Sequence, residues 1–419
     1  MKSFLLQLAL VIMSISTVTG QEWNTVKDFS SGTIKSVLYV NESTAFAVSS
    51  LYNGTALNVK KTTDDGETWI EQFTGQTNQN FRKIISPNNG EDLFIIGNSG
   101  ILMHSTNGED NWDLVSIPTL SHLRDIFFLS PTIGYISCDN ATILKTIDGG
   151  MTWINMNVDL SGIATIAKIH FISEDRGYIA GFNYFRETSN GGVTWTDVPG
   201  FENTPGTLYQ IQDFFFVNDQ VGYICGDQAL LYKTTDGGNT WVDMKVDIPG
   251  IDFTIESLFS IHFLDNHPNI GFACGYHGLL IRTYDGGVNW ELMSSDIEGT
   301  NTDFGSIFHD LDFFGNKGLM SSQHGQILKY VYSPTSIPEL NQEKMSFQIF
   351  PNPATDNINI KISDVTIDQF KIYDYSGKIY KMIDYPKSNH IDCSDLESGN
   401  YILTISSNGI ISAESFVKQ

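Results

Sequence analysis

The amino-acid sequence predicts an all-β protein: a seven-bladed β-propeller followed by a small Ig-like antiparallel β-sandwich. Three observations support this prediction. An eight-residue motif recurs six times at nearly constant spacing, glycine and aromatic residues are abundant, and the C-terminal segment alternates apolar and polar residues between short turns. The length of 419 residues exceeds what one small core organises, so we expect more than one domain.

The composition excludes several classes of protein. The chain has 48 acidic and 24 basic residues, a net charge of −24, and such a surface repels the phosphate backbone of nucleic acids. Charged residues make up only 17%, aromatic residues 12%, and there are 37 glycines, which disfavours both disorder and long charged helices. A turn-rich β protein fits this mixture.

The N-terminus has the features of a signal peptide over residues 1–20. Lys2 supplies a positive charge, residues 4–13 are apolar, and Val18 and Gly20 are small residues before an expected cleavage point. We find no later apolar run of the roughly 18 residues that span a bilayer, so no transmembrane segment is expected in the mature chain.

The recurring motif has the form TTDGGNTW. Its six copies occupy 62–69, 105–112, 146–153, 188–195, 234–241 and 283–290. The copies lie about 40–50 residues apart, a period typical of propeller blades. Each unit between them contains short β-rich runs separated by Gly, Asn and Asp, which predicts about four antiparallel strands per unit.

The motif predicts a tight turn. Asp-Gly or Asn-Gly supplies positive φ angles, the carboxylate and the hydroxyl can bond within the turn, and we expect the Trp ring to pack on the blade while its indole N–H bonds outward. These residues resemble the Asp-box, or BNR repeat, and the resemblance implies a structural role at the blade periphery. The residues given this role are Asp64, Trp69, Asp148, Trp153, Asn190, Trp195, Asp236, Trp241, Asp285 and Trp290. The second copy has Asn107 and Glu109 in place of Asp and Gly, so we expect a distorted turn there.

Tryptophan positions suggest how the ring closes. Six of the seven Trp end a motif, and the seventh, Trp23, precedes all of them in a segment that resembles the outgoing strands. At the other end, the run 325–330 enters no further motif. We therefore predict that the Trp23 strand completes the last of seven blades within a propeller of residues 21–332, which removes free sheet edges; six blades is the alternative.

The four cysteines show no CxxC spacing and no nearby His cluster, so neither a metal nor a cofactor is expected. Cys225 and Cys274 occupy equivalent positions in consecutive units, which should lie too far apart for a disulfide. We expect them, like Cys138, to be buried packing residues.

The C-terminal region divides into a polar linker, 333–346, and a β-rich segment, 347–419. The segment contains FQIFPNPATDNINIKI, KIYDYSGKIY and IDCSDLESGNYILTISS in that order. It resembles the C-terminal sorting domain of the type IX secretion system of Bacteroidetes. The resemblance implies transit through the periplasm, the secretion machinery as a partner, and release or attachment at the cell surface. A carbohydrate-binding accessory sandwich is the alternative.

Propellers usually bind ligands at the mouth of the central channel, where the innermost strands begin. Aligning the units gives a ring of equivalent positions there, the mouth ring: Lys35, Arg82, Arg124, Ala167, Gln212, Phe259 and His309. The next positions form a second ring, the belt: Ser36, Lys83, Asp125, Lys168, Asp213, Ser260 and Asp310. The candidate ligand-binding residues are Arg82, Arg124, Gln212, His309 and Lys35, with an anion or carboxylate as the contact. Alternatively, each arginine pairs with a neighbouring Asp such as Asp125 and holds blades together.

No catalytic set is recognisable. GxSxG, HExxH, P-loop and Rossmann motifs are absent, and the Arg-Ile-Pro signature and third ring arginine of sialidases are missing. A glycoside hydrolase using Asp125, Asp213 and Asp310 is the alternative enzymatic hypothesis. The full repeat pattern resembles photosystem II stability/assembly factor propellers, which are non-enzymatic binding scaffolds. The sequence thus predicts a secreted or surface-displayed scaffold that binds a protein or glycan, with no catalytic residue assigned.

Overall fold

The computed structural model describes residues 23–29, 32–50, 58–74, 80–106, 108, 111–160, 162–199, 201, 209–244, 256–293, 307–332, 347–362, 367, 369–374, 379–384, 386–407 and 410–419. The predicted signal peptide and linker lie outside these residues, as do Asn107 and Glu109 of the second motif. The chain divides into two compact units, Met1–Ser333 and Pro334–Gln419.

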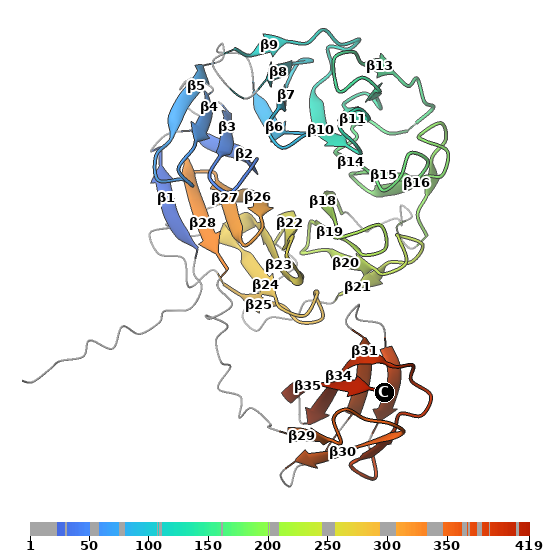
Figure 1. Ribbon diagram of the computed structural model, residues 1–419. Coiled ribbons are helices and arrows are strands. Elements are labelled where there is room, and N and C mark those ends of the chain that lie inside the picture. The colour runs from blue at the N-terminus through green and yellow to red at the C-terminus, as the bar shows by residue number, and fades with distance from the viewer. Residues whose placement is uncertain are drawn as a thin grey trace, which may run out of the picture. The chain divides into compact units, whose positions relative to one another are not determined.

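The first unit is a ring of antiparallel sheets (Figure 1). Its described residues form seven four-stranded sheets, six of them from four consecutive strands. These six are β2 (Thr33–Tyr39), β3 (Ala45–Ser50), β4 (Asn58–Thr62) and β5 (Ile70–Thr74); β6 (Phe81–Ile85), β7 (Asp92–Gly97), β8 (Leu102–Thr106) and β9 (Asp113–Leu114); β10 (Leu123–Phe128), β11 (Gly134–Cys138), β12 (Ile143–Thr146) and β13 (Ile154–Asn155); β14 (Lys168–Phe171), β15 (Gly177–Gly181), β16 (Tyr184–Thr188) and β17 (Thr196–Asp197); β18 (Ile211–Phe216), β19 (Gly222–Gly226), β20 (Leu231–Thr234) and β21 (Val242–Asp243); and β22 (Leu258–Leu264), β23 (His267–Gly275), β24 (Leu280–Thr283) and β25 (Glu291–Leu292). A 3-10 turn, η1 (Tyr276–Gly278), separates β23 from β24.

The second strand of each blade is the most deeply buried. Every residue of β11, β15 and β19 is buried, because these strands pack between neighbouring sheets. Their sequences begin Gly-Tyr for a steric reason: a Cβ at Gly222 would lie 2.5 Å from the ring of Phe216, and one at Gly134 would lie 2.7 Å from the ring of Phe128. The recurring glycine therefore makes room for an aromatic side chain of the innermost strand.

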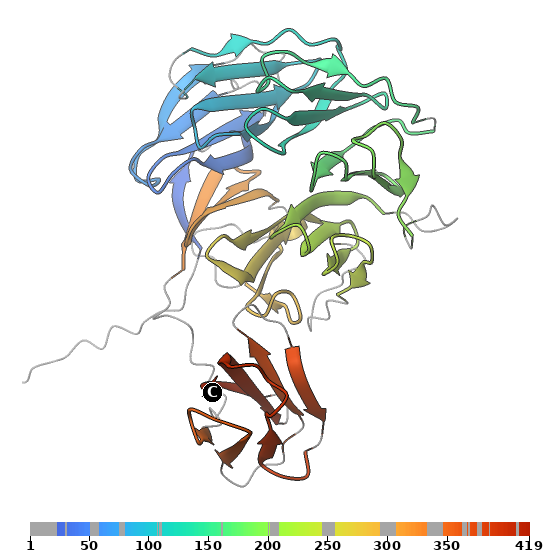
Figure 2. The same ribbon diagram turned by 45° about the vertical axis from the view of Figure 1, so that its right-hand side comes forward.

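The seventh sheet joins the two ends of the propeller. It consists of β26 (Phe308–Phe314), β27 (Lys317–Ser322), β28 (Gln326–Val331) and, outermost, β1 (Asn24–Asp28). Strand β1 pairs antiparallel with β28, and the blue and orange strands lie side by side in Figures 1 and 2. Trp23, just before β1, is fully buried. Its indole stacks on Tyr330 at 5.4 Å and meets Phe272 and Phe313 edge-on at 5.7 and 6.0 Å.

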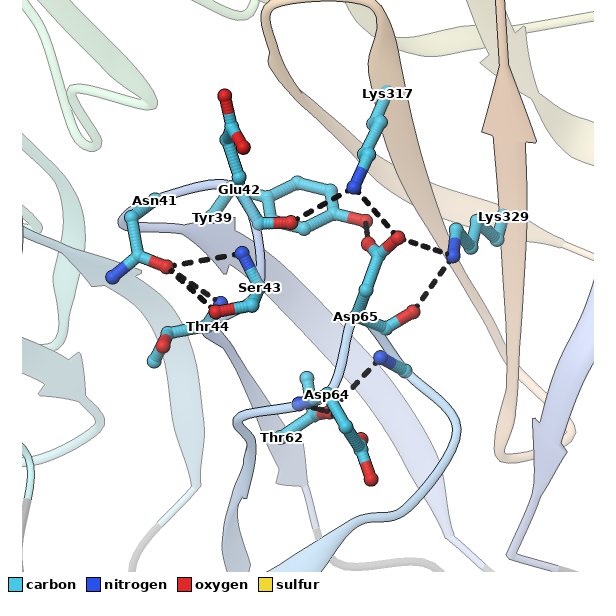
Figure 3. Close-up of polar contacts among 11 residues, drawn as sticks. Tyr39, Asn41, Glu42, Ser43, Thr44, Thr62, Asp64, Asp65, Lys317 and Lys329 are labelled. Atoms are coloured by element: carbon cyan, nitrogen blue, oxygen red, sulfur yellow. Dashed lines mark hydrogen bonds and ion pairs between the residues drawn. The ribbon is translucent and has the colours of Figure 1, made fainter.

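The carboxylate of Asp65 also connects this last sheet to the first (Figure 3). Asp65, from the first motif, accepts hydrogen bonds from Lys317 Nζ at 2.8 Å, Lys329 Nζ at 2.6 Å and Tyr39 Oη at 2.9 Å. Lys317 and Lys329 also donate to the backbone oxygens of Glu42 and Asp65. Burial opposes ionisation of Asp65, but the two lysines outweigh it and lower the pKa of the carboxyl. We call these four side chains (Tyr39, Asp65, Lys317 and Lys329) the clasp.

The clasp requires an unusual residue in the first motif. Asp65 has φ 59°, whereas the five other motifs have glycine at this position with φ of 63–73°. We expect Asp65→Gly to relieve backbone strain and yet lower the free energy of unfolding by about 1–2 kcal/mol, because two partly buried lysines lose their counter-ion. Urea unfolding of the full chain measures this difference. An Asp65→Gly variant as stable as the original chain would show that the clasp does no more than offset the backbone strain at Asp65. Asp65→Asn keeps an acceptor for Tyr39, so its free energy of unfolding should lie between those of the original chain and Asp65→Gly.

The second unit is a small sandwich of two sheets. The order of one is β29 (Phe347–Phe350), β30 (Asn357–Ile362) and β33 (His390–Asp392); the order of the other is β32 (Ile379–Asp384), β31 (Gln369–Asp374), β34 (Gly399–Ser407) and β35 (Ile410–Lys418). Ile358, Phe370, Ile372, Leu403 and Ile405 are among the buried residues of its core. The all-β prediction of a propeller followed by an Ig-like sandwich is thereby confirmed.

All four cysteines are free and buried, and burial raises the pKa of the Cys225 and Cys274 thiols. Across the part of the chain that the structure describes, no helix has the length and apolar character to cross a membrane.

Candidate functional site

The repeated motifs form closed turns between the third and fourth strands of their blades. In the fifth copy, Asp236 Oδ1 accepts from Thr234 Oγ1 at 2.8 Å and from the Thr240 backbone N–H at 2.9 Å, while Gly238 N donates to Thr234 Oγ1 at 2.7 Å. The same pattern recurs around Asp64, Asp148, Asn190 and Asp285. These polar groups are used inside the turn, which accounts for the motif as a structural device.

The prediction for the motif Trp needs correction. The indole N–H groups of Trp69, Trp153 and Trp195 do not bond outward. They donate back into their own turns, to the carbonyl oxygens of Gly66, Gly150 and Gly192 at 2.9–3.1 Å. The turn brings that carbonyl to the indole N–H, so these three Trp side chains each close the turn that precedes them. The indole N–H groups of Trp112, Trp241 and Trp290 are buried and have no hydrogen-bond partner among the described residues.

The mouth ring is built by β-bulges. In six innermost strands the pairing with the second strand slips by one residue near the start, and the extra residue is in each case a member of the mouth ring. These six residues are Lys35, Arg82, Arg124, Gln212, Phe259 and His309. The fourth blade shows no slip, and its ring residue Ala167 precedes β14. Because a bulge redirects a side chain, these six can turn from blade packing toward the channel.

The six bulged residues line one cavity of about 700 Å³ at the centre of the ring. All five predicted ligand-binding residues are among them, and the cavity also reaches the belt below. Ala167 is not part of the lining. The structure therefore brings all five predicted ligand-binding residues together around one cavity.

Belt residues with acceptor side chains connect each blade to the next. Asp125 Oδ2 accepts from the backbone N–H of Ile169 at 3.2 Å, and Asp213 Oδ2 accepts from that of Ile261 at 3.1 Å. The same link runs from Asp310 to Val37, from Ser36 to Ile84 and from Ser260 to Leu311. In five blades a backbone donor of the innermost strand is thus already satisfied by a side chain of the preceding blade.

Where the belt residue is lysine, an ion pair replaces the acceptor. Lys83 Nζ lies 2.6 Å from Asp125 Oδ1, and Lys168 Nζ lies 3.0 Å from Asp213 Oδ1. Two of the three carboxylates considered for glycoside hydrolysis therefore hold both a lysine and a backbone N–H. This arrangement weighs against the enzymatic hypothesis, because an acid/base pair must be free to reach substrate.

The last blade carries two partly buried carboxylates on its innermost strand, Asp310 and Asp312. Burial raises the pKa of Asp310 to about 6, although a hydrogen bond from Ser36 opposes the shift. Burial raises that of Asp312 to about 8, and Asp312 Oδ2 accepts the backbone N–H of Tyr39 at 2.6 Å. Sequence analysis did not single out Asp312. Asp312 is two residues after Asp310 in β26, and residues two apart in a strand lie on the same face, so this spacing could have identified Asp312 as a second candidate.

The two ring arginines differ in how far their charge is neutralised. Arg124 makes a two-pronged ion pair with Asp139 of its own blade, with both N···O distances at 2.6 Å. Arg124 therefore pairs with an aspartate, as the alternative interpretation expected, but the partner is Asp139 of its own blade and not Asp125. Arg82 instead donates to the neutral side chain of Asn98 at 2.9 Å and forms no ion pair with any described carboxylate. Arg82 thus presents a net positive charge to the cavity.

The other mouth residues complete a mixed surface. Gln212 donates to Asp227 at 3.0 Å, and Lys35 Nζ lies 3.1 Å from His309 Nε2. Phe259 meets Tyr276 edge-on at 6.4 Å. The position of Tyr276, directly after a second strand, corresponds in the fourth blade to Phe182, which is 57% exposed. Sequence analysis missed these aromatic residues because they follow the second strand and not the start of the first.

Fold and site together define a class of protein: a closed Asp-box propeller with a side-chain-lined channel mouth, joined to a second β domain. The family profile described as photosynthesis system II assembly factor YCF48 matches residues 15–120, 109–214, 154–258 and 207–293, and the chain belongs to that family. The secretion system C-terminal sorting domain matches residues 348–419. This domain directs the protein to secretion or to attachment at the outer cell surface.

Curated relatives match over part of their length. A photosystem II assembly protein Ycf48 from Synechococcus sp. (strain JA-2-3B'a(2-13)) is 32% identical over 141 residues, 33% of this chain and 41% of the relative. A photosystem II assembly lipoprotein Ycf48 from Trichormus variabilis is 34% identical over 132 residues, 31% of this chain and 38% of the relative. The chain therefore spans less than half the length of these relatives.

Solved structures show the same fold. One described as YCF48 bound to D1 peptide has a TM-score of 0.58 at 18% identity and covers 75% of this chain and 100% of its own. The GH74 xyloglucanase from Xanthomonas campestris has a TM-score of 0.59 at 13% identity, covering 82% of this chain and 60% of its own. At such identities the likeness concerns the fold and not the activity.

Proposed function

We propose that this protein is a non-catalytic scaffold, secreted or displayed at the cell surface, whose channel mouth binds a protein or glycan through an anionic group. The observation that carries the proposal is the set of six bulges, each of which directs a mouth-ring side chain toward one cavity. Bulges of this kind are typical of positions where a fold re-aims side chains for function.

The charges at the mouth fit a single anion better than a polyanion. Lys35 and Arg82 form no ion pair with a described carboxylate, whereas Arg124 is already paired with Asp139. The chain as a whole carries a net charge of −24, which repels polyanions at long range. The ligand is therefore one with a localised carboxylate or similar group, held where two cations converge.

The ligand is recognised through its side groups rather than by strand addition. Side chains of the preceding blade accept the N–H groups of Ile84, Ile169, Ile261, Leu311 and Val37, so these donors are not open to an added peptide strand. Phe259, which lines the cavity, offers an aromatic contact for an apolar side chain or a sugar face. A family relative solved with a D1 peptide supports a peptide as one of the two ligand classes.

The test uses arrays of acidic peptides and acidic glycans probed with the mature chain, residues 21–419. We expect the double variant Lys35→Gln, Arg82→Gln to lose about 30- to 700-fold in affinity for the ligands that bind, because the two charged contacts contribute about 1–2 kcal/mol each. The matched control is Lys60→Gln, Arg186→Gln, which removes one lysine and one arginine that pair with Glu71 and Asp197 on outer strands. Equal binding by both double variants would place the site elsewhere.

A further inference from the structure

Three lysines line the channel cavity, and they differ in their partners. Lys83 and Lys168 each contact an aspartate of the next blade at 2.6 and 3.0 Å. Lys35 instead contacts the imidazole of His309 at 3.1 Å and forms no ion pair with a described carboxylate. Lys35 lies at a β-bulge and lines the cavity, so its amine is accessible to a ligand in the cavity. Lys35 is thus set apart from the two structural lysines.

We propose that Lys35 is a carbonyl-capturing amine, which forms an imine with the aldehyde or ketone group of a small anionic compound whose negative charge is held by Arg82. This inference goes beyond the proposed scaffold function, because it assigns covalent chemistry to one residue of the mouth. It rests on three features of the cavity. The Lys35 amine forms no ion pair with a described carboxylate, and His309 lies within hydrogen-bond distance of it. On the adjacent blade, Arg82 lines the same cavity and also forms no ion pair with a described carboxylate.

The surroundings of Lys35 increase the fraction of its neutral, nucleophilic form near neutral pH, while the cation still predominates. Burial and the neighbouring Arg82 lower the pKa of Lys35 to about 8. Burial and Lys35 lower the pKa of His309 to about 3, so the imidazole stays neutral and can accept a hydrogen bond. These two groups, Arg82 from β6 and His309 from β26, are the titratable side chains that face Lys35 among the described residues. An amine that donates an N–H to His309 keeps its lone pair for a carbonyl carbon.

The reaction is a condensation that needs no oxidant or reductant. The Lys35 lone pair attacks the carbonyl carbon, the C=O π pair moves to the oxygen, and that oxygen takes up a proton to give a carbinolamine. Loss of water then forms the C=N bond, so one amine and one carbonyl give one imine and one water. Protons exchange with solvent in the open cavity. A carboxylate or phosphate on the same compound would lie at Arg82, which forms no ion pair with a described carboxylate.

The cavity suits a compound of this size. About 700 Å³ falls in the range of small-molecule sites, and the lining combines cations with the amide of Gln212 and the ring of Phe259. The chemical class is therefore a small carbonyl acid or a phosphorylated aldehyde. A neutral aldehyde has no group for Arg82 and should react less.

The test uses the mature full-length chain at pH 7.5 with pyridoxal 5′-phosphate, trapped with borohydride and mapped by peptide mass spectrometry. We expect at least tenfold more labelling at Lys35 than at the exposed tail lysines Lys361 and Lys387, which serve as internal references. Arg82→Gln should reduce the Lys35 signal several-fold without changing the reference sites, and benzaldehyde should show no preference for Lys35.

Labelling of Lys35 at or below the level of Lys361 would overturn the inference, as would an Arg82→Gln variant that labels like the original chain. Lys35→Arg, which keeps the charge and removes the amine, checks the assignment by abolishing the site-specific adduct. The outcome is separable from that of the array experiment: noncovalent ligand binding that depends on Arg82 can persist when Lys35 does not react, and the scaffold proposal fails only in the array.

Discussion

Replacing Trp23 by alanine is expected to lower the free energy of unfolding of the propeller by about 3–5 kcal/mol, the usual range for an aromatic residue deleted from a core. The indole is fully buried and contacts Phe272, Phe313 and Tyr330 in the seam between the last two sheets. Its loss leaves a cavity next to β1, the strand that joins the two ends of the ring. The ring should therefore open at this seam at lower temperature or denaturant concentration.

Scanning calorimetry of the full chain measures the effect as a fall in the transition temperature of the propeller. Ile154→Ala is the matched control, since Ile154 is 62% exposed on an outer strand and should change stability by no more than about 0.5 kcal/mol. A Trp23→Ala variant that loses less than about 1 kcal/mol would show that β1 contributes little to closure.

Replacing Asp125 by alanine is expected to cost about 2–4 kcal/mol of unfolding free energy, because Lys83 loses its counter-ion and the Ile169 N–H loses its acceptor. This expected loss of unfolding free energy is smaller than for a fully buried ion pair, because the Lys83 side chain is 31% exposed. Asp197→Ala is the control: this aspartate pairs with Arg186 at 2.7 Å but is 54% exposed, so a loss of no more than about 1 kcal/mol is expected.

The Asp125 effect should also depend on pH. Burial alone would raise the pKa of this carboxyl, but the charges of Lys83 and Lys168 outweigh burial and hold the pKa below its usual value. A depressed carboxyl pKa gives stability that is present above the unfolded pKa, near 4, and is lost as the pH falls through the lower folded value. The stability difference between the original chain and Asp125→Ala should therefore be constant near neutrality and shrink in acid. A difference that grows toward low pH would contradict the proposed ion pair.

Asp125 also separates the structural from the catalytic interpretation of the belt. If Asp125 is structural, Asp125→Ala should be less stable than the original chain, and neither should hydrolyse glycosides. A catalytic role predicts the reverse, a stable variant that has lost hydrolysis. The hydrogen bonds from Ile169 and Lys83 favour the structural role.

Much of the propeller was predictable because its determinants are local and repeated. The turn motif with its Trp recurs in six units, and a Gly-Tyr strand recurs in three of them. Alignment of the units therefore placed Lys35, Arg82 and His309 in one ring. The tail was recognisable for a different reason, since its segments occur together in a characteristic order, and the sorting-domain match to 348–419 confirms that prediction.

The parts that escaped sequence reasoning depend on contacts between distant segments. The sequence around β10 does not indicate that its pairing with β11 has a bulge at Arg124. It also does not indicate that Arg124 pairs with Asp139 rather than with Asp125. The clasp is a similar case: Asp65 looks like a minor departure from the motif until Lys317 and Lys329 arrive from more than 250 positions away. The contacts of Asp65 with Lys317 and Lys329 form only because the last blade lies beside the first in the closed ring, and the repeat pattern does not specify which side chains meet there.

The central claim, that the mouth binds without catalysis, is tested most directly by incubating the mature chain with a broad panel of polysaccharides and sialosides and measuring released reducing ends. The account predicts no release from any member of the panel, including members that the chain retains on the array. Release that disappears in Asp213→Asn or Asp310→Asn would contradict it and identify the belt as an active site.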